Sequence, residues 1–346
     1  MRKVCKMEVF QKIKELNKKL VDFKDNKALG LANGKMGRCI YFSCISKSKE
    51  YESIVSQLID DIYSQIDSLL FHDIKTGWMG IGLGINFLIE NNHLKGDVNV
   101  VLKDIDTAII KLLNKSSFRD NLSIFEQNQF LYYLYIRLLS QKKGRELETI
   151  FQEYSISLIN NLHEKIDAEL FDGPLYFDVD YPLPLLLYVL SRISNLNFYN
   201  YKIDRVLQDI SFQILSKIPF LHANRLYLIW GIEAINKQMQ NKNWENHICL
   251  LRREFDFYEM LNNEFGSRNI YFNNGLPAAY LLIKVLPDYF TQDEMNEYNR
   301  QIIKKIEQSS EWEKLLNDED YFKLKSGLFD GWSGTSLLLH YENRLK

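Results

Sequence analysis

The sequence predicts an all-α protein, an α/α toroid of seven helical hairpins. Amphipathic helical stripes recur along the whole chain, and shorter apolar segments that open on glycines lie between them. These openings recur about every fifty residues, which is typical of a repeat architecture. Each repeat then pairs an outer amphipathic helix with an inner apolar helix. We expect one domain spanning residues 1–346, in which residues 1–29 form the first outer helix and lead into the ring.

The outer helices are predicted where apolar residues recur at intervals of three and four. In the first of them, Val9, Ile13, Leu16 and Leu20 share one stripe. Only six prolines interrupt the chain, so long helices are possible throughout. The predicted outer helices cover residues 7–23, 51–70, 98–113, 146–162, 203–218, 243–261 and 293–306.

The inner helices share an opening motif that is best preserved near the two ends of the chain. Residues 30–37 (GLANGKMG) and 327–334 (GLFDGWSG) both read G-L-x-x-G-x-x-G, and shorter copies occur at 77–80 (GWMG) and 274–278 (NGLPA). Three further openings have lost their glycines and are marked by Gln127, Tyr181 and Ala223.

Glycines at the start of a helix allow close approach of a neighbouring backbone, and this structural role is the simplest one for the motif. The first turn of a helix also carries unpaired N–H groups and a partial positive charge. The sequence therefore predicts that the inner-helix starts form a face able to bind anions, carboxylates or peptide carbonyls.

The balance of charges excludes several classes of protein. The chain has 43 basic and 45 acidic residues, whereas nucleic-acid binders usually carry a basic excess. Its first residues lack the apolar stretch of a signal peptide, and no segment approaches the roughly 20 apolar residues needed to cross a bilayer. We expect a cytoplasmic protein with no nucleic-acid partner and no membrane span.

The repeated G-x-x-G openings, together with the closing segment LFDGWSGTSLLLHY at residues 328–341, resemble the lanthionine synthetase C-like family. The resemblance covers roughly residues 30–346 and is strongest in the end repeats. It implies an α/α toroid that cyclises a lanthipeptide precursor, in which a peptide cysteine adds to a dehydrated residue and forms a thioether. It also implies a zinc ion held by two cysteines and a histidine, because bound zinc supplies a thiolate at neutral pH.

The zinc ligands that the resemblance implies are missing from this sequence. Where the family has C-H-G in its sixth repeat, the chain has Asn273 and Asn274, and the fifth-repeat stretch 220–223 (FLHA) has no cysteine. Amide oxygens are poor substitutes for thiolate and imidazole on zinc. Cys39 and Cys44 lie on the first inner helix, where we expect small core residues. The prediction is a protein without a metal or other cofactor.

The catalytic candidates open the fourth and fifth inner helices. Asp180 stands where the family has a histidine, and Ser123 stands where its third repeat has an aspartate. His222 and Arg225 begin the fifth inner helix, where a histidine could move protons. A helix cap for Asp180 and a solvated loop position for His222 are the plainer alternatives.

The candidates for substrate binding lie in the sixth, seventh and second repeats. Asn273 and Asn274 could bind peptide amides, although both are also ordinary turn residues. Trp78 and Trp332 follow the first glycine of the G-x-x-G in repeats two and seven, and they could stack on a substrate or pack between repeats. Asp330 is a further candidate, with a helix cap as its alternative role.

Three functions follow from these features. The first is a zinc-free protein that takes part in modifying a precursor peptide, with a dehydratase or another peptide-modifying enzyme as a possible partner. The second is an inactive scaffold that holds the peptide for such an enzyme. The third is a carbohydrate-active enzyme on a similar ring, which would need a pair of carboxylates at a fixed separation.

Overall fold

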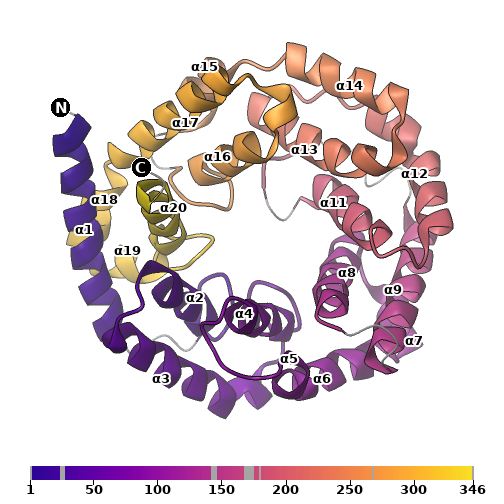
Figure 1. Cartoon of the computed structure of the whole chain (residues 1–346), viewed down its shortest axis with the longest axis horizontal. Coiled ribbons are helices and arrows are strands. Elements are labelled where there is room, and N and C mark those ends of the chain that lie inside the picture. The colour runs from indigo at the N-terminus through magenta and orange to yellow at the C-terminus, as the bar shows by residue number, and fades with distance from the viewer. Residues whose placement is uncertain are drawn as a thin grey trace. The chain divides into compact units, whose positions relative to one another are not determined.

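The computed structural model describes residues 2–23, 28–141, 146–166, 175–178, 181–266 and 269–344, and every regular element in these ranges is a helix (Figure 1). The seven predicted outer stripes each contain a helix: α1 (Arg2–Asp22), α3 (Lys49–Gln65), α6 (Lys103–Leu113), α9 (Glu146–Lys165), α12 (Asn200–Leu215), α14 (Lys242–Arg253) and α17 (Gln292–Glu307). The inner helices are α2 (Lys35–Ile45), α4 (Trp78–Glu90), α8 (Ile124–Leu139), α11 (Pro182–Ser194), α13 (His222–Met239), α16 (Leu276–Val285) and α20 (Trp332–Arg344). The prediction of an all-α protein built from helix pairs is confirmed.

Two outer stripes are interrupted where the sequence predicted continuous helices. The stripe 98–113 divides at Leu102 into α5 (Val98–Val101) and α6. In the stripe 243–261, α14 ends at Arg253, and the Asp256 carboxylate then accepts hydrogen bonds from two following backbone N–H groups. Aspartate caps the start of a new helix in this way. The remaining short helices are α7 (Ser116–Asn121), α15 (Phe257–Glu259), α18 (Glu311–Asn317), α19 (Glu319–Leu324), η1 (Ile66–Ser68), η2 (Met260–Glu264) and η3 (Pro287–Tyr289).

The chain divides into two compact units. Unit 1 comprises Met1–Ile105, Phe265–Lys284 and Phe290–Lys346, and unit 2 comprises Asp106–Glu264 and Val285–Tyr289. The first and last repeats therefore share unit 1, while the middle repeats form unit 2. That the whole chain is a single domain stays a prediction.

Unit 1 brings the two ends of the chain together. Helices α2, α4 and α20 pack side by side, and α1 packs along α18 and α17 (Figure 1). The Tyr41 hydroxyl on α2 lies 2.9 Å from that of Ser336 on α20, and Arg344 donates to the carbonyl of Ile45 at 3.0 Å. The apolar stripe of α1 is buried, with Ile13 fully covered.

Unit 2 places α8, α11 and α13 side by side, backed by α9, α12 and α14 (Figure 1). A Cβ added at Gly231 on α13 would lie 2.7 Å from the Cα of Pro184 on α11. Glycine at this position therefore allows the two helices to approach closely. Ser191 fixes the same contact by donating to the carbonyl of Ala234 at 2.7 Å.

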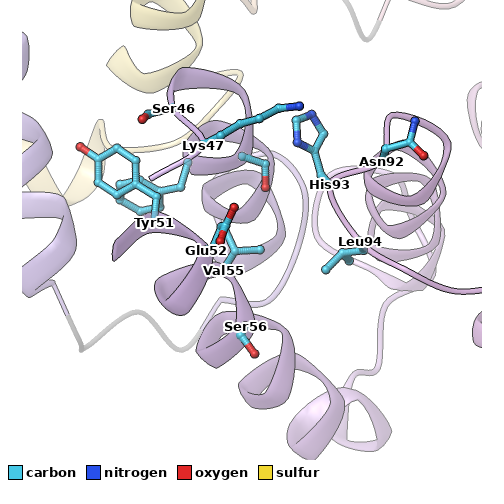
Figure 2. Close-up of a pocket in the computed structure, with 11 residues that line it drawn as sticks. Ser46, Lys47, Tyr51, Glu52, Val55, Ser56, Asn92, His93 and Leu94 are labelled. Carbon is cyan, nitrogen blue, oxygen red and sulfur yellow. The ribbon is translucent and has the colours of Figure 1, made fainter. Parts of the chain in front are cut away.

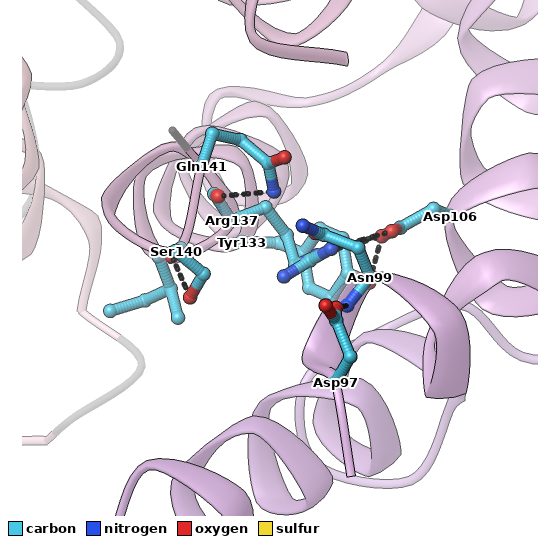
Figure 3. A network of polar contacts seen from close by, with 8 residues as sticks. Asp97, Asn99, Asp106, Tyr133, Arg137, Ser140 and Gln141 are labelled. Carbon is cyan, nitrogen blue, oxygen red and sulfur yellow. Dashed lines mark hydrogen bonds and ion pairs between the residues drawn. The ribbon is translucent and has the colours of Figure 1, made fainter. Parts of the chain in front are cut away.

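A buried ion pair joins α6 to α8 in unit 2 (Figure 3). The Arg137 guanidinium donates to both carboxylate oxygens of Asp106, at 2.9 and 3.1 Å, and the Tyr133 hydroxyl donates to the same carboxylate at 2.8 Å. All of these side chains are buried, and the Arg137 guanidinium also lies over the ring of Phe151. Burial and the neighbouring carboxylate raise the pKa of Tyr133 well above its ordinary value, so the phenol remains a donor.

Candidate functional site

The opening motifs of unit 1 are joined in series by backbone hydrogen bonds. Asn273 N–H donates to the carbonyl of Phe329 at 3.1 Å, and Leu328 N–H donates to the carbonyl of Ala32 at 2.6 Å. Ala32 N–H in turn donates to the carbonyl of Lys75 at 2.9 Å. The loops of repeats six, seven, one and two thus form one connected surface of backbone at the inner-helix starts.

The expectation of unpaired N–H groups at these helix starts is wrong for α2 and α4. Each loop folds back so that its carbonyls accept from the first turn of the following helix. The first three N–H groups of α2 donate to the carbonyls of Ala28, Leu29 and Gly30, and those of α4 to the carbonyls of Phe71, His72 and Asp73. These helix starts are therefore not available as backbone anion sites, because their donors are already satisfied.

The same geometry explains the last glycine of each motif. A Cβ at Gly37 would collide with the carbonyl of Leu31, and one at Gly80 would collide with that of Ile74. The returning loop lies so close to the helix that no side chain fits between them. The structural role expected for the glycines is the one observed.

Asp330 and Asn33 occupy equivalent positions in the seventh and first motifs and lie together. The Asn33 amide donates to the Asp330 carboxylate at 3.3 Å. Both side chains remain partly open to solvent, so Asp330 still presents an acceptor at the motif surface. Its distance to Asn33 is long for a charge-assisted bond, which leaves the carboxylate free to bind a better donor.

The equivalent tryptophans Trp78 and Trp332 have different surroundings. Trp78 is half-buried, and its indole N–H donates to the carbonyl of Ile66 at 3.3 Å. Trp332 is fully buried, with Tyr41 edge-on at 5.5 Å and Phe322 stacked at 6.4 Å. A covered indole presents no face to a substrate, so Trp332 packs the interior of unit 1, and Trp78 alone of the pair reaches the surface.

The two asparagines of the sixth motif also differ. Both lie in the turn that precedes α16, as a turn role requires. Asn274 is exposed, whereas the Asn273 side-chain oxygen is enclosed and has no hydrogen-bond partner among the described residues. An enclosed acceptor without a partner is costly, so Asn273 is a point where a bound donor would be stabilising.

In unit 2, His222 and Arg225 begin α13 as the sequence predicted, and they contact each other. The Arg225 guanidinium lies 3.1 Å from His222 Nδ1 and donates to the carbonyls of Pro219 and Glu254. Asp256 N–H also donates to His222 Nδ1 at 3.1 Å. Since a backbone N–H can only donate, Nδ1 is the acceptor, and neutral His222 carries its proton on Nε2.

The start of α13 is capped by a residue that sequence reasoning did not identify. The two Glu264 carboxylate oxygens accept from the N–H groups of His222 and Ala223 at 2.6 and 2.9 Å. No local sequence signal marks this cap, because Glu264 follows the helix start by a whole hairpin. The carboxylate favours the positive end of the helix and fixes His222 in place.

Replacing Glu264 with alanine is expected to lower the free energy of unfolding by about 1–2 kcal/mol, because two N–H groups lose their acceptor. Urea unfolding followed by circular dichroism would measure the change. The matched control is Glu259→Ala, which removes an exposed carboxylate from the same segment and should change stability by less than about 0.5 kcal/mol. Equal losses in both variants would contradict the capping role.

The polar candidates of the third and fourth repeats are Ser123 and Asp180. Asp180 lies outside the described residues. Ser123 is the N-cap of α8 in a capping box with Glu126, so its side chain is committed to the helix start. On the same helix, the buried Asn128 side chain has no hydrogen-bond partner in the described part of the chain. The run of polar residues EQNQ at this lost motif could have signalled it.

A further polar group lies just before the sixth motif. The hydroxyls of Tyr271 and Tyr321 both donate to the buried carboxylate of Glu311, the first at 3.1 Å. Burial and hydrogen bonding raise the pKa of Tyr271 far above its ordinary value. Tyr271 therefore stays protonated and holds the segment that leads into Asn273.

The donor set does not fit the zinc that the family resemblance implies. Among the described residues, no group of three or more His, Cys, Asp or Glu side chains could hold a metal. Burial raises the pKa of Cys39 to about 12, and Cys249 is exposed on α14. With Asn273 and Asn274 at the sixth motif, the described residues supply neither thiolate nor imidazole there.

The comparisons with known proteins support the fold. The chain is similar to a solved structure titled "Nisin cyclase", with a TM-score of 0.65 and 14% identity, over 99% of this chain and 94% of that one. No family profile and no curated protein matches the sequence. Within the described ranges, no helix has the length and apolar character that crossing a membrane requires. The fold is therefore all-α and of the α/α-toroid class.

Proposed function

We propose that this protein takes part in the modification of a ribosomally made peptide, as a cyclase-like protein that works without zinc. The observation that carries the proposal is the similarity to a structure titled "Nisin cyclase" over nearly the whole length of both chains. The motif loops of unit 1 add support, because backbone hydrogen bonds join them in series at the helix starts. Asn33, Asp330, Asn274 and Trp78 are residues of these loops and helix starts that reach the surface.

His222 is the proton-handling candidate in this proposal. Its Nε2 has no partner in the described part of the chain, while Nδ1 is held by a backbone N–H. When a peptide thiolate adds to the β-carbon of a dehydroamino acid, the double-bond electrons move toward the carbonyl and an enolate forms. The thiol proton passes to water as the thiolate forms, and the addition makes the C–S bond. A positioned Nε2–H can then donate a proton to the α-carbon of the enolate, and the imidazole regains its proton from water.

The alternative is a scaffold that binds the precursor without closing thioether rings. The presence of Asn273 and Asn274 where the family has metal ligands favours this form, since amides bind peptide groups but do not activate thiols. Among the described residues, none donates to the enclosed side-chain oxygen of Asn273, which a peptide N–H could therefore satisfy.

The test is to incubate the purified protein with a dehydrated, cysteine-containing precursor and to count free thiols with a labelling reagent. A cyclase consumes thiols, and His222→Gln should slow this by about a hundredfold if the imidazole supplies the proton. His163→Gln, on α9 beside Asp209, is the matched control and should leave the rate unchanged.

A scaffold binds the precursor with no thiol loss. Absence of both binding and thiol loss would contradict the proposal, and stoichiometric zinc in the purified protein would contradict its metal-free form.

A further inference from the structure

Unit 1 contains a cavity of about 310 Å³ that the motif loops do not touch (Figure 2). It lies between the end of α2, the start of α3 and the turn after α4. The motif loops precede α2 and α4, whereas this cavity lies at the carboxyl ends of the same helices. Its volume falls in the range of small-molecule sites.

Two nitrogen-bearing side chains meet on one side of the cavity. The Lys47 ammonium points toward the His93 imidazole (Figure 2). Burial and the charge of Lys47 lower the pKa of His93, so the imidazole is neutral at neutral pH. Within the described ranges, neither side chain has a hydrogen-bond or ion-pair partner, although His93 stacks on Phe87 at 6.4 Å. This side of the cavity therefore favours an anionic group.

A carboxylate faces the same space from the first turn of α3. Glu52 extends into the cavity in Figure 2, and no ion pair joins it to Lys47 or to another described residue. Opposite charges that share a small cavity without pairing leave room for a ligand that carries both charges. The carboxylate would bind the ammonium group of such a ligand, as Lys47 would bind its anionic group.

Part of the cavity lining is apolar. The half-buried ring of Tyr51 faces this space, and the fully buried Phe42 ring supports it from behind at 5.0 Å and 42°, with Val55 buried beside them. An apolar or aromatic side chain of a ligand would be removed from water against this wall. The cavity thus offers one cation, one carboxylate and one apolar surface.

We propose that this cavity binds a free α-amino acid with an apolar side chain. The ligand carboxylate lies on Lys47 and His93, its ammonium group lies on Glu52, and its side chain packs on the ring of Tyr51. The proposal is independent of the peptide-modifying function, because it concerns other residues at the other ends of the helices.

The test is calorimetric titration with L-phenylalanine, N-acetyl-L-phenylalanine and L-phenylalanine amide. The zwitterion should bind, and each analogue, which lacks one charge, should bind about tenfold or more weakly, as expected for the loss of a charged hydrogen bond. Lys47→Gln should weaken L-phenylalanine about tenfold and leave the amide unaffected, and Glu52→Gln should do the same for the N-acetyl compound. Lys49→Gln, which removes an exposed charge at the start of α3 and outside the cavity lining, is the matched control.

The titrations have one result that supports the amino-acid site and two that overturn it. Selective loss in the two cavity variants, with the control unchanged, supports the site. Absence of heat with L-phenylalanine up to millimolar concentration, or binding that neither variant alters, overturns it. Circular dichroism spectra of the variants confirm that each is folded. No precursor peptide is present in these titrations, so a failed thiol assay does not affect their interpretation.

Discussion

Replacing Gly334 with alanine is expected to lower the free energy of unfolding by about 2–3 kcal/mol. The new Cβ would collide with the carbonyl of Leu328 and lie 2.8 Å from the ring of Phe272. The loop cannot easily move away, because Leu328 N–H is bound to the carbonyl of Ala32 at 2.6 Å. The substitution therefore strains the contact between the last repeat and the first.

The expected loss of stability in Gly334→Ala is opposite to the usual effect of replacing glycine with alanine in a helix. In an unconstrained helix, alanine is more stable than glycine by about 1 kcal/mol, so stabilisation is the ordinary expectation. Urea unfolding of the variant measures the difference. Gly266→Ala is the control, since a Cβ there meets nothing within 4 Å. If Gly334→Ala is as stable as the parent, the tight loop-to-helix contact described for the motif is incorrect.

Replacing Arg137 with methionine is expected to destabilise the protein by about 3–5 kcal/mol, because a buried carboxylate loses its counter-ion. Asp106 would still accept the hydrogen bond from the Tyr133 hydroxyl but would have lost the guanidinium (Figure 3). The loss should appear as a lower urea midpoint, measured by circular dichroism. Lys242→Met breaks the exposed pair with Glu245 and should cost less than about 1 kcal/mol.

A double variant separates the cost of the unpaired charge from the loss of packing. In Asp106→Leu with Arg137→Met, both charges are absent, and most of the stability should return. If the double variant is less stable than Arg137→Met alone, packing rather than the uncompensated carboxylate causes the loss.

The sequence predicted the helices and their starts well, because these depend on local signals. Gly34 and Gly77 precede α2 and α4 as the motif indicated. Even a repeat without glycines was found correctly, since α11 begins at Pro182, a residue suited to the first turn of a helix. The continuity of the outer helices was less well predicted, because Asp256 starts a new turn inside an apolar stripe.

The surroundings of the candidate residues could not be predicted in the same way, because they depend on distant contacts. The carbonyls of the motif loops accept hydrogen bonds from the first turns of α2 and α4, so the expected backbone anion sites are already occupied. Trp78 and Trp332 share a motif position, yet the second is fully buried, with Tyr41 and Phe322 among its neighbours. Similarly, Glu264 holds His222 from another hairpin. The choice between catalysis and scaffolding stays a prediction.

Helix α1 is synthesised long before α17 and α18, the helices against which it packs. Residues 106–264 of unit 2 leave the ribosome before any of residues 290–346, which complete unit 1. At typical elongation rates, α1 is made roughly 15–60 s before its partners. During that interval nothing from the last repeats covers the apolar stripe that carries Ile13 and Leu16, so the N-terminal helix is exposed to wrong association while the middle of the chain is made.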